Sequence, residues 1–148
     1  MRLQGAREQP AATDLEHGFG GIAKFFPPGK PTLAAIEAEL FARLGCQHVF
    51  DDQYISSGGQ IHELVTGRDR FVADLRPLVD ARALACHPYD LCTALILQEA
   101  GGIVTDPWGG PLDAPLDTTS PVAWAGYANP ALAERIGPLL ADVLHDVL

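Results

Sequence analysis

The residue types best suited to chemistry occur in one segment, residues 87–106 (HPYDLCTALILQEAGGIVTD). Pro88 suits the first turn of a helix, and the Gly101–Gly102 pair suits its end. Asp90 would then lie in the first turn, where the helix dipole and the unpaired amide groups stabilise a carboxylate. Such a carboxylate can hold a hard cation. It can equally act as a simple helix cap, and the spacing alone favours the cap.

Cys86, His87 and Cys92 are close in sequence and raise the question of a zinc site. Structural zinc sites are usually built from two short ligand pairs, such as C-x2-C followed by a second pair. The sequence has no such pattern. A secreted disulfide framework usually has an even number of cysteines, whereas this chain has three, the third being Cys46. We therefore expect reduced, mostly buried thiols and a cytoplasmic location.

Length, charge and hydropathy exclude several classes of function. The 148 residues include 19 acidic and 10 basic side chains, for a net charge of −9, and 47% of them are hydrophobic. A nucleic-acid groove needs clustered basic residues, but only Arg68, Arg70 and Arg76 are even loosely grouped, and we expect these to be solvated. No apolar stretch approaches the roughly 18 residues of a membrane span, and the first residues lack an export signal. We therefore expect no nucleic-acid or membrane partner.

Periodicity and capping residues predict an alternation of helices and strands. Helices are expected from Thr32 to Gly45, over 58–66, from Pro88 to Gly101, and after Asn129–Pro130; strands are expected over 48–50, 71–75, 103–105 and 122–127. This alternation predicts an α/β fold with a mixed, mostly parallel sheet. Residues 1–18 are polar and lack apolar periodicity, so we expect a disordered arm followed by a single domain over 19–148.

The same segment resembles the C-terminal signature of the inositol monophosphatase family. Tyr89-Asp90, an apolar helix and then EAGGIVTD (99–106) are similar to that family's Trp-Asp, apolar residues and Glu-Ala-Gly-Gly. The resemblance continues upstream through ELVTGRDRFVADL (63–75) and downstream through Gly109–Leu112 and NPALAERI (129–136). It implies a layered α-β-α domain like the C-terminal half of that fold.

The resemblance also implies roles for particular residues. Asp90 matches a ligand of a catalytic Mg2+ in an enzyme that hydrolyses phosphomonoesters of inositol or sugars with metal-activated water. Asp74 occupies the place of an acidic residue that holds a substrate hydroxyl. Ser57, Gly58 and Gly59 resemble the glycine-containing helix start that approaches the substrate, a task suited to the amide groups there.

Several features depart from the family's pattern. Tyr89 replaces the usual Trp, and the gap between Asp74 and Asp90 is longer. Eight residues separate Asp90 from Glu99, one fewer than the family has. One residue is about 100° of helix rotation, so the helix must be bulged, shortened or re-registered near its start.

The largest departure is the absence of the D-P-x-D-G-T motif, which supplies most of the family's metal ligands together with an upstream glutamate. Asp106-Pro107-Trp108-Gly109 echoes it only superficially and in the wrong place. The catalytic site is therefore incomplete in this chain, and its Mg2+ site is weak or partial. We expect the missing ligands from a partner chain that supplies the N-terminal half, or from a longer parent protein.

Three hypotheses follow from the sequence. The first is an Mg2+-dependent phosphomonoesterase to which this chain supplies one half of the site, so that the chain alone is inactive. The second is a non-catalytic α/β domain with a binding or structural role. The third is a truncated gene product without a function of its own. The uncovered face of a half-fold would be apolar, which predicts capture of a partner chain or a homodimer.

Overall fold

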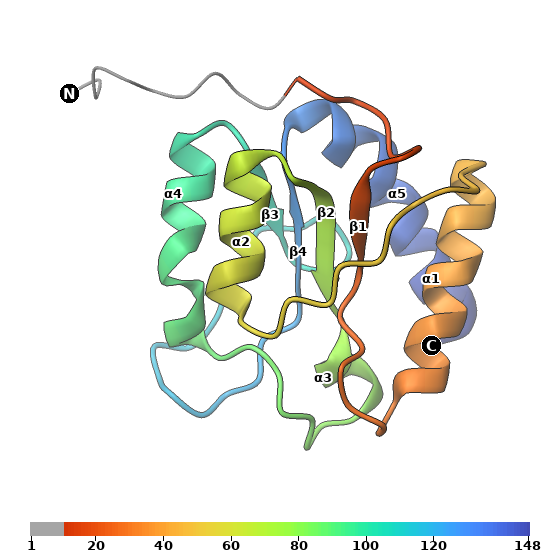
Figure 1. Ribbon diagram of the computed structural model, residues 1–148. Coiled ribbons are helices and arrows are strands. Elements are labelled where there is room, and N and C mark those ends of the chain that lie inside the picture. The colour runs from red at the N-terminus through yellow and green to blue at the C-terminus, as the bar shows by residue number, and fades with distance from the viewer. Residues whose placement is uncertain (1–10) are drawn as a thin grey trace.

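Helices cover both faces of a four-stranded sheet in the computed structural model, which describes residues 11–148 (Figure 1). In chain order the elements are β1 (Phe19–Ile22), α1 (Lys30–Leu44), α2 (Ser57–Thr66), β2 (Asp69–Asp74), α3 (Arg76–Val79), the 3-10 helix η1 (Pro88–Thr93), α4 (Ala94–Glu99), β3 (Ile103–Thr105), β4 (Trp124–Tyr127) and α5 (Pro130–Val147). Helices α2 and α4 lie on one face of the sheet, and α1 and α5 lie on the other. The predicted α-β-α layering is confirmed.

The sheet is mixed, as predicted, with the strand order β1-β2-β4-β3. β1 pairs with β2 in parallel, whereas β4 is antiparallel to both β2 and β3. Three strands therefore run in one direction, and only β4 is reversed. Two of the three hydrogen-bonded pairings are nevertheless antiparallel, because β4 is inserted between β2 and β3.

Capping residues define the helix ends. The Asn129 side chain accepts a hydrogen bond from the amide of Leu132 at 3.0 Å, so the predicted cap of α5 is confirmed. Gly45 ends α1 in the left-handed conformation, with φ of 70°. The start of α1 differs from the prediction: the helix begins at Lys30, after Gly29 with φ of 74°, and Thr32 lies inside it. Pro31 suits the first turn, which explains the earlier start.

The helix predicted from Pro88 to Gly101 is divided into two parts. Residues Pro88–Thr93 form the 3-10 helix η1, and Ala94–Glu99 form α4. A 3-10 helix has about three residues per turn rather than 3.6, so it changes the direction in which each side chain points. The predicted irregularity near the start of this helix is therefore confirmed.

Part of the predicted N-terminal arm packs against the domain. Residues 1–10 lie outside the described residues, but Leu15 is fully buried in the core. The backbone oxygen of Ala12 accepts a hydrogen bond from the side-chain Nδ2 of Asn129 at 2.9 Å. The amide of His17 donates to the carbonyl of His48 at 2.7 Å. These contacts join residues 12–17 to the start of α5 and to the segment after α1.

The strand predicted over 48–50 is reduced to a single bridge. Phe50 pairs in parallel with Phe19, and its amide donates to the carbonyl of Gly18 at 2.8 Å. One bridge is too short to count as a strand, so this prediction is wrong. The segment nevertheless runs along the free edge of β1 (Figure 1).

The core lies between the sheet and its two helical layers. Its largest fully buried side chains are Trp124 and Tyr127 of β4 and Phe71 of β2. Leu33, Ile36 and Leu40 recur at helical spacing along α1 and are buried, so this face of the helix packs against the core. Of the described helices, none combines the length and the apolar character that a bilayer crossing requires.

Candidate functional site

Cys86 lies at the point where the three predicted site segments meet. Its amide donates a hydrogen bond to Asp74, at the end of β2, at 3.2 Å. Its thiol is hydrogen bonded to Ser57, the first residue of α2, and it lies within the electrostatic reach of Asp90 in η1. The start of α2, the end of β2 and the start of η1 all lie at the lower edge of the sheet in Figure 1.

The Cys86 thiol is a structural contact rather than a nucleophile. The residue is fully buried, and this burial raises the pKa of the thiol to about 12. The negative charges of Asp74 and Asp90 act in the same direction, while the hydrogen bond to Ser57 opposes them. A thiol with so high a pKa stays protonated at neutral pH and is a poor nucleophile and metal ligand.

Asp74 is fully buried and is held by Arg76 in a bidentate ion pair. The Nε and Nη2 atoms of Arg76 lie 2.8 and 2.7 Å from the two carboxylate oxygens. The backbone amides of Arg76 and Cys86 donate to the same carboxylate. A substrate hydroxyl could reach Asp74 only after Arg76 had withdrawn.

Arg76 was expected at the solvated surface with Arg68 and Arg70, and this expectation is wrong. The residue is only 5% exposed. Its Nη1 donates to the carbonyl of Leu84 at 2.7 Å, and its guanidinium lies 4.8 Å from the centre of the Phe25 ring. The carboxylate, the carbonyl and the aromatic ring together compensate the buried charge.

Asp90 caps the start of η1, and it is the most accessible of the predicted acidic site residues. Its Oδ2 accepts a hydrogen bond from the amide of His87 at 2.9 Å. The His87 ring, whose Nδ1 lies 3.6 Å from the same oxygen, stacks on Tyr89. The Asp90 side chain is 29% exposed, and its contacts with the His87 amide and ring are both made by Oδ2. One carboxylate oxygen is therefore available to a ligand.

The first turn of α2 lies directly against η1. Thr93 donates a side-chain hydrogen bond to the carbonyl of Gly58 at 3.4 Å. A Cβ atom added to Gly58 would come 3.9 Å from the backbone oxygen of Asp90. The next residue, Gly59, lies under the ring of Tyr54, so a larger side chain there would overlap the ring. The first turn of α2 thus lies beside the backbone of η1 at Asp90.

The described residues around Asp90 do not make a complete Mg2+ site. Within residues 11–148, neither Asp90 nor Asp74 belongs to a group of three His, Cys, Asp or Glu side chains close enough to share an ion. Magnesium prefers about six oxygen ligands in octahedral geometry, several of them water. Asp90 offers one oxygen, and Arg76 neutralises Asp74. The residues present therefore fit one corner of such a site and not the whole.

An open hollow lies at the first two residues of η1. It has a volume of about 290 Å3 and is lined by Pro88 and Tyr89 of η1 and by residues 116–118. Asp117 at its wall has a lowered pKa, chiefly because the Ser120 hydroxyl donates to its carboxylate. The hollow could receive the apolar part of a ligand whose polar end reaches η1.

Sequence reasoning identified the segments of this region but missed the residues that join them. The roles of Arg76 and Cys86 depend on contacts between β2 and the loop that precedes η1, and no local motif reports such contacts. The signal available for Arg76 was its position two residues after Asp74, which lets a side chain turn back onto the end of the strand.

No family model and no curated protein matches the chain in sequence. Its structure is similar to that of a staphylococcal IMPase-II (TM-score 0.61, 20% identity), with 94% of this chain and 49% of that chain covered. The inositol monophosphate-bound structure of SaIMPase-II aligns equally well (TM-score 0.62, 20% identity), with 94% and 48% covered. A hypothetical protein from Pyrococcus horikoshii with similarities for inositol-1 monophosphatase has a TM-score of 0.59 at 16% identity, with 99% and 48% covered.

Proposed function

The chain has the fold of about half of an inositol monophosphatase-like protein, and we propose that it supplies one half of a phosphomonoesterase site. The substrate would be a phosphorylated small molecule of the inositol or sugar phosphate class. The remaining metal ligands would come from a second polypeptide segment, either a partner chain or another part of a longer protein. Mg2+ is the proposed ion, because oxygen ligands such as carboxylates suit it.

One observation carries this proposal: the segments whose sequence resembles the inositol monophosphatase family converge around Cys86. Ser57, Asp74 and Asp90 come from three different elements, yet all three are hydrogen bonded to Cys86 or within its electrostatic reach.

Each candidate site residue of this chain would have one limited task in that site. Asp90 would offer its unengaged oxygen to the ion, whose chemistry when bound is to activate water and stabilise the phosphoryl oxygens. The first-turn amides of α2, at Ser57 and Gly58, would donate to the phosphate. Asp74 would contact a substrate hydroxyl if Arg76 withdrew. Otherwise it would act as a positioning residue that fixes Cys86 and the approach to η1.

A non-catalytic binding or structural domain is the second candidate, and the Asp74–Arg76 ion pair favours it. A carboxylate held by four hydrogen bonds is stable without any ligand. In that case the fold would be retained for contacts with another protein. The exposed apolar side chains Leu95 and Ile96 on α4, which are 64% and 56% exposed, would then lie at the contact.

The first test is the behaviour of the chain alone. We expect no Mg2+-dependent turnover of inositol or sugar phosphates by the purified 148-residue chain, because one carboxylate cannot position both the water and the leaving group. Millimolar Mg2+ should change its melting temperature little. Turnover at ordinary enzyme rates, about 1–1000 per second, would contradict the half-site proposal, since the chain would then hold a complete site.

A further inference from the structure

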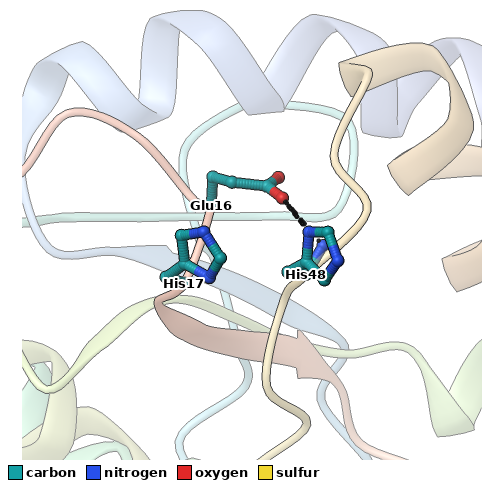
Figure 2. Close-up of side chains that lie close together, drawn as sticks. All are labelled: Glu16, His17 and His48. Carbon is teal, nitrogen blue, oxygen red and sulfur yellow. Dashed lines mark hydrogen bonds and ion pairs between the residues drawn. The ribbon is translucent and has the colours of Figure 1, made fainter.

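The side chains of Glu16, His17 and His48 lie close together (Figure 2). They come from the segments before β1 and after α1, not from the elements that carry Asp74, Cys86 and Asp90. One potential ligand atom from each lies within 4.8 Å of the other two. They are the one such group of His, Cys, Asp or Glu side chains within residues 11–148. We propose that these three residues form a binding site for Zn2+ or a chemically similar transition-metal ion.

The donor set favours this class of ion. Two imidazole nitrogens and one carboxylate oxygen are the ligands of many three-residue zinc sites, which keep a fourth position for water. Magnesium and calcium prefer oxygen ligands, so the two histidines give them little. The proposed site is therefore distinct in chemistry, as well as in place, from the carboxylate site proposed at Asp90.

The backbone holds the two histidines in register before any ion binds. The amide of His17 donates to the carbonyl of His48 at 2.7 Å, and the amide of Phe50 donates to Gly18 at 2.8 Å. The two imidazole rings are consequently stacked, with centroids 5.3 Å apart and planes 17° apart. A site whose ligands are already side by side loses less conformational entropy on binding.

Glu16 is fixed in place by the same segment of backbone that carries His48. Its carboxylate accepts hydrogen bonds from the amides of Gln47 and His48 at 3.1 and 3.0 Å. The Nδ1 atom of His48 lies 2.7 Å from the same carboxylate. The ligand that brings negative charge to the site is thus held by its main-chain neighbours.

The contact between Glu16 and His48 has a geometry that an ion can enter. The Oε1 atom of Glu16 lies 2.7 Å from Nδ1 of His48, and a hydrogen bond joins the two atoms (Figure 2). A zinc ion about 2.0–2.2 Å from each atom, at an angle near 90–110°, needs the pair to open to only about 3–3.5 Å. Binding of the ion at Nδ1 would require the ring to carry its one remaining proton on Nε2. A doubly protonated ring would release its Nδ1 proton to solvent, and a neutral ring would bind as the Nε2–H tautomer.

His17 has a backbone conformation that is unusual for its residue type. Its φ is 60°, in the left-handed region, and it is the one described non-glycine residue with a positive φ. Glycine adopts this conformation without strain, so the position would tolerate glycine in a purely structural role. This property supplies a variant that removes the ligand without disturbing the fold.

Calorimetric titration of Zn2+ into the full chain, with a thiol-free reductant present, tests the proposal. We expect a site of 1:1 stoichiometry in the native chain, at least tenfold weaker binding in His17→Gly and Glu16→Gln, and no detectable site in His17→Gly/His48→Ala. The matched control is His62→Ala/His145→Ala, which removes two exposed histidines elsewhere and should bind as the native chain does.

A second measurement separates loss of the site from loss of the fold. The metal-free His17→Gly chain should melt at or above the native temperature, because glycine relieves the positive φ. Saturating Zn2+ should then raise the melting temperature of the native chain and of the control variant but not of His17→Gly/His48→Ala. Equal zinc affinity in all variants would overturn the proposal, since binding would then occur at the cysteines or at other groups. Absence of zinc binding in the native chain would overturn it as well.

Discussion

Replacing Asp69 with asparagine is expected to stabilise the protein at pH 8 by about 2–4 kcal/mol. Asp69 begins β2 and is fully buried, and neither carboxylate oxygen has a hydrogen-bond partner among residues 11–148. Its pKa is raised from 3.8 to about 7, chiefly by burial and in addition by the negative charges of Asp52 and Glu63. At pH 8 the native chain therefore keeps an uncompensated charge in its interior, which asparagine removes.

The pH dependence gives this prediction its sign. The folded pKa of Asp69 lies above the unfolded value, so between about pH 4 and pH 7 the folded chain holds a proton that the unfolded chain has released. The stability that this proton contributes is complete below about pH 4 and is lost as the pH rises through about 7. The benefit of Asp69→Asn should consequently be smaller at pH 5.5 than at pH 8.

Urea unfolding of both chains at the two pH values measures the effect. Asp113→Asn is the matched control, because Asp113 is exposed and its charge loss should change stability by no more than about 0.5 kcal/mol at either pH. A destabilisation by Asp69→Asn at pH 8, or a benefit independent of pH, would show that the Asp69 carboxylate is compensated in the folded chain.

Replacing Arg76 with methionine is expected to destabilise the protein by about 3–5 kcal/mol. The substitution removes both hydrogen bonds to Asp74, the bond to the Leu84 carbonyl and the contact with the Phe25 ring. The carboxylate of Asp74 would remain fully buried without its counter-ion. Leaving one buried charge unpaired costs more than removing the pair together.

The double variant Asp74→Leu/Arg76→Met tests that explanation by urea unfolding. It should recover a large part of the loss, because no buried charge remains. The matched control is Arg82→Met, since Arg82 lies 3.9 Å from Asp80 at the same sequence spacing, but its side chain is 94% exposed. That change should cost no more than about 1 kcal/mol. A loss below about 1 kcal/mol for Arg76→Met would contradict a buried, essential ion pair.

The sequence predicted those features of the fold that depend on local signals. Asn129 and Gly45 indicate helix ends for local reasons. The Asn129 side chain accepts a hydrogen bond from the first turn of α5, and Gly45 adopts the left-handed conformation that ends α1. The missing residue between Asp90 and Glu99 predicted an irregular helix start, and η1 occupies that position. The start of α1 was misplaced because Thr32 is a common cap, whereas Gly29 and Pro31 define the end actually used.

Features that depend on contacts between distant segments could not be predicted. The segment 48–50, expected as a strand, forms only one bridge. The number of its residues that pair depends on the edge of β1 and not on the segment's own residues. Glu16 and His48 are 32 residues apart, and no spacing rule joins them. Asp69 precedes the strand predicted to begin at Phe71, and it becomes buried because β2 extends back to pair with Phe19 of β1.

The candidate site was predicted to the same extent. Asp90 and the Ser57–Gly59 turn were proposed from short motifs that resemble the family, and their roles stay predictions. The buried state of Asp74 was not predicted, since it depends on Arg76 folding back over the strand end and on the amide of Cys86. A resemblance in sequence can therefore assign a position without assigning the partners that determine what the position does.

The most direct test of the half-site proposal is hydrolysis of inositol and sugar phosphates by a reconstituted pair. The chain would be co-expressed with a polypeptide that carries the Asp-Pro-x-Asp-Gly-Thr motif, first of all one encoded beside it, and the complex would be assayed with Mg2+. We expect turnover by the complex and by its Asp113→Asn control, and a loss of at least 100-fold in Asp90→Asn, about 3 kcal/mol of transition-state stabilisation. A stable complex without turnover, or one in which Asp90→Asn remains fully active, would contradict the account.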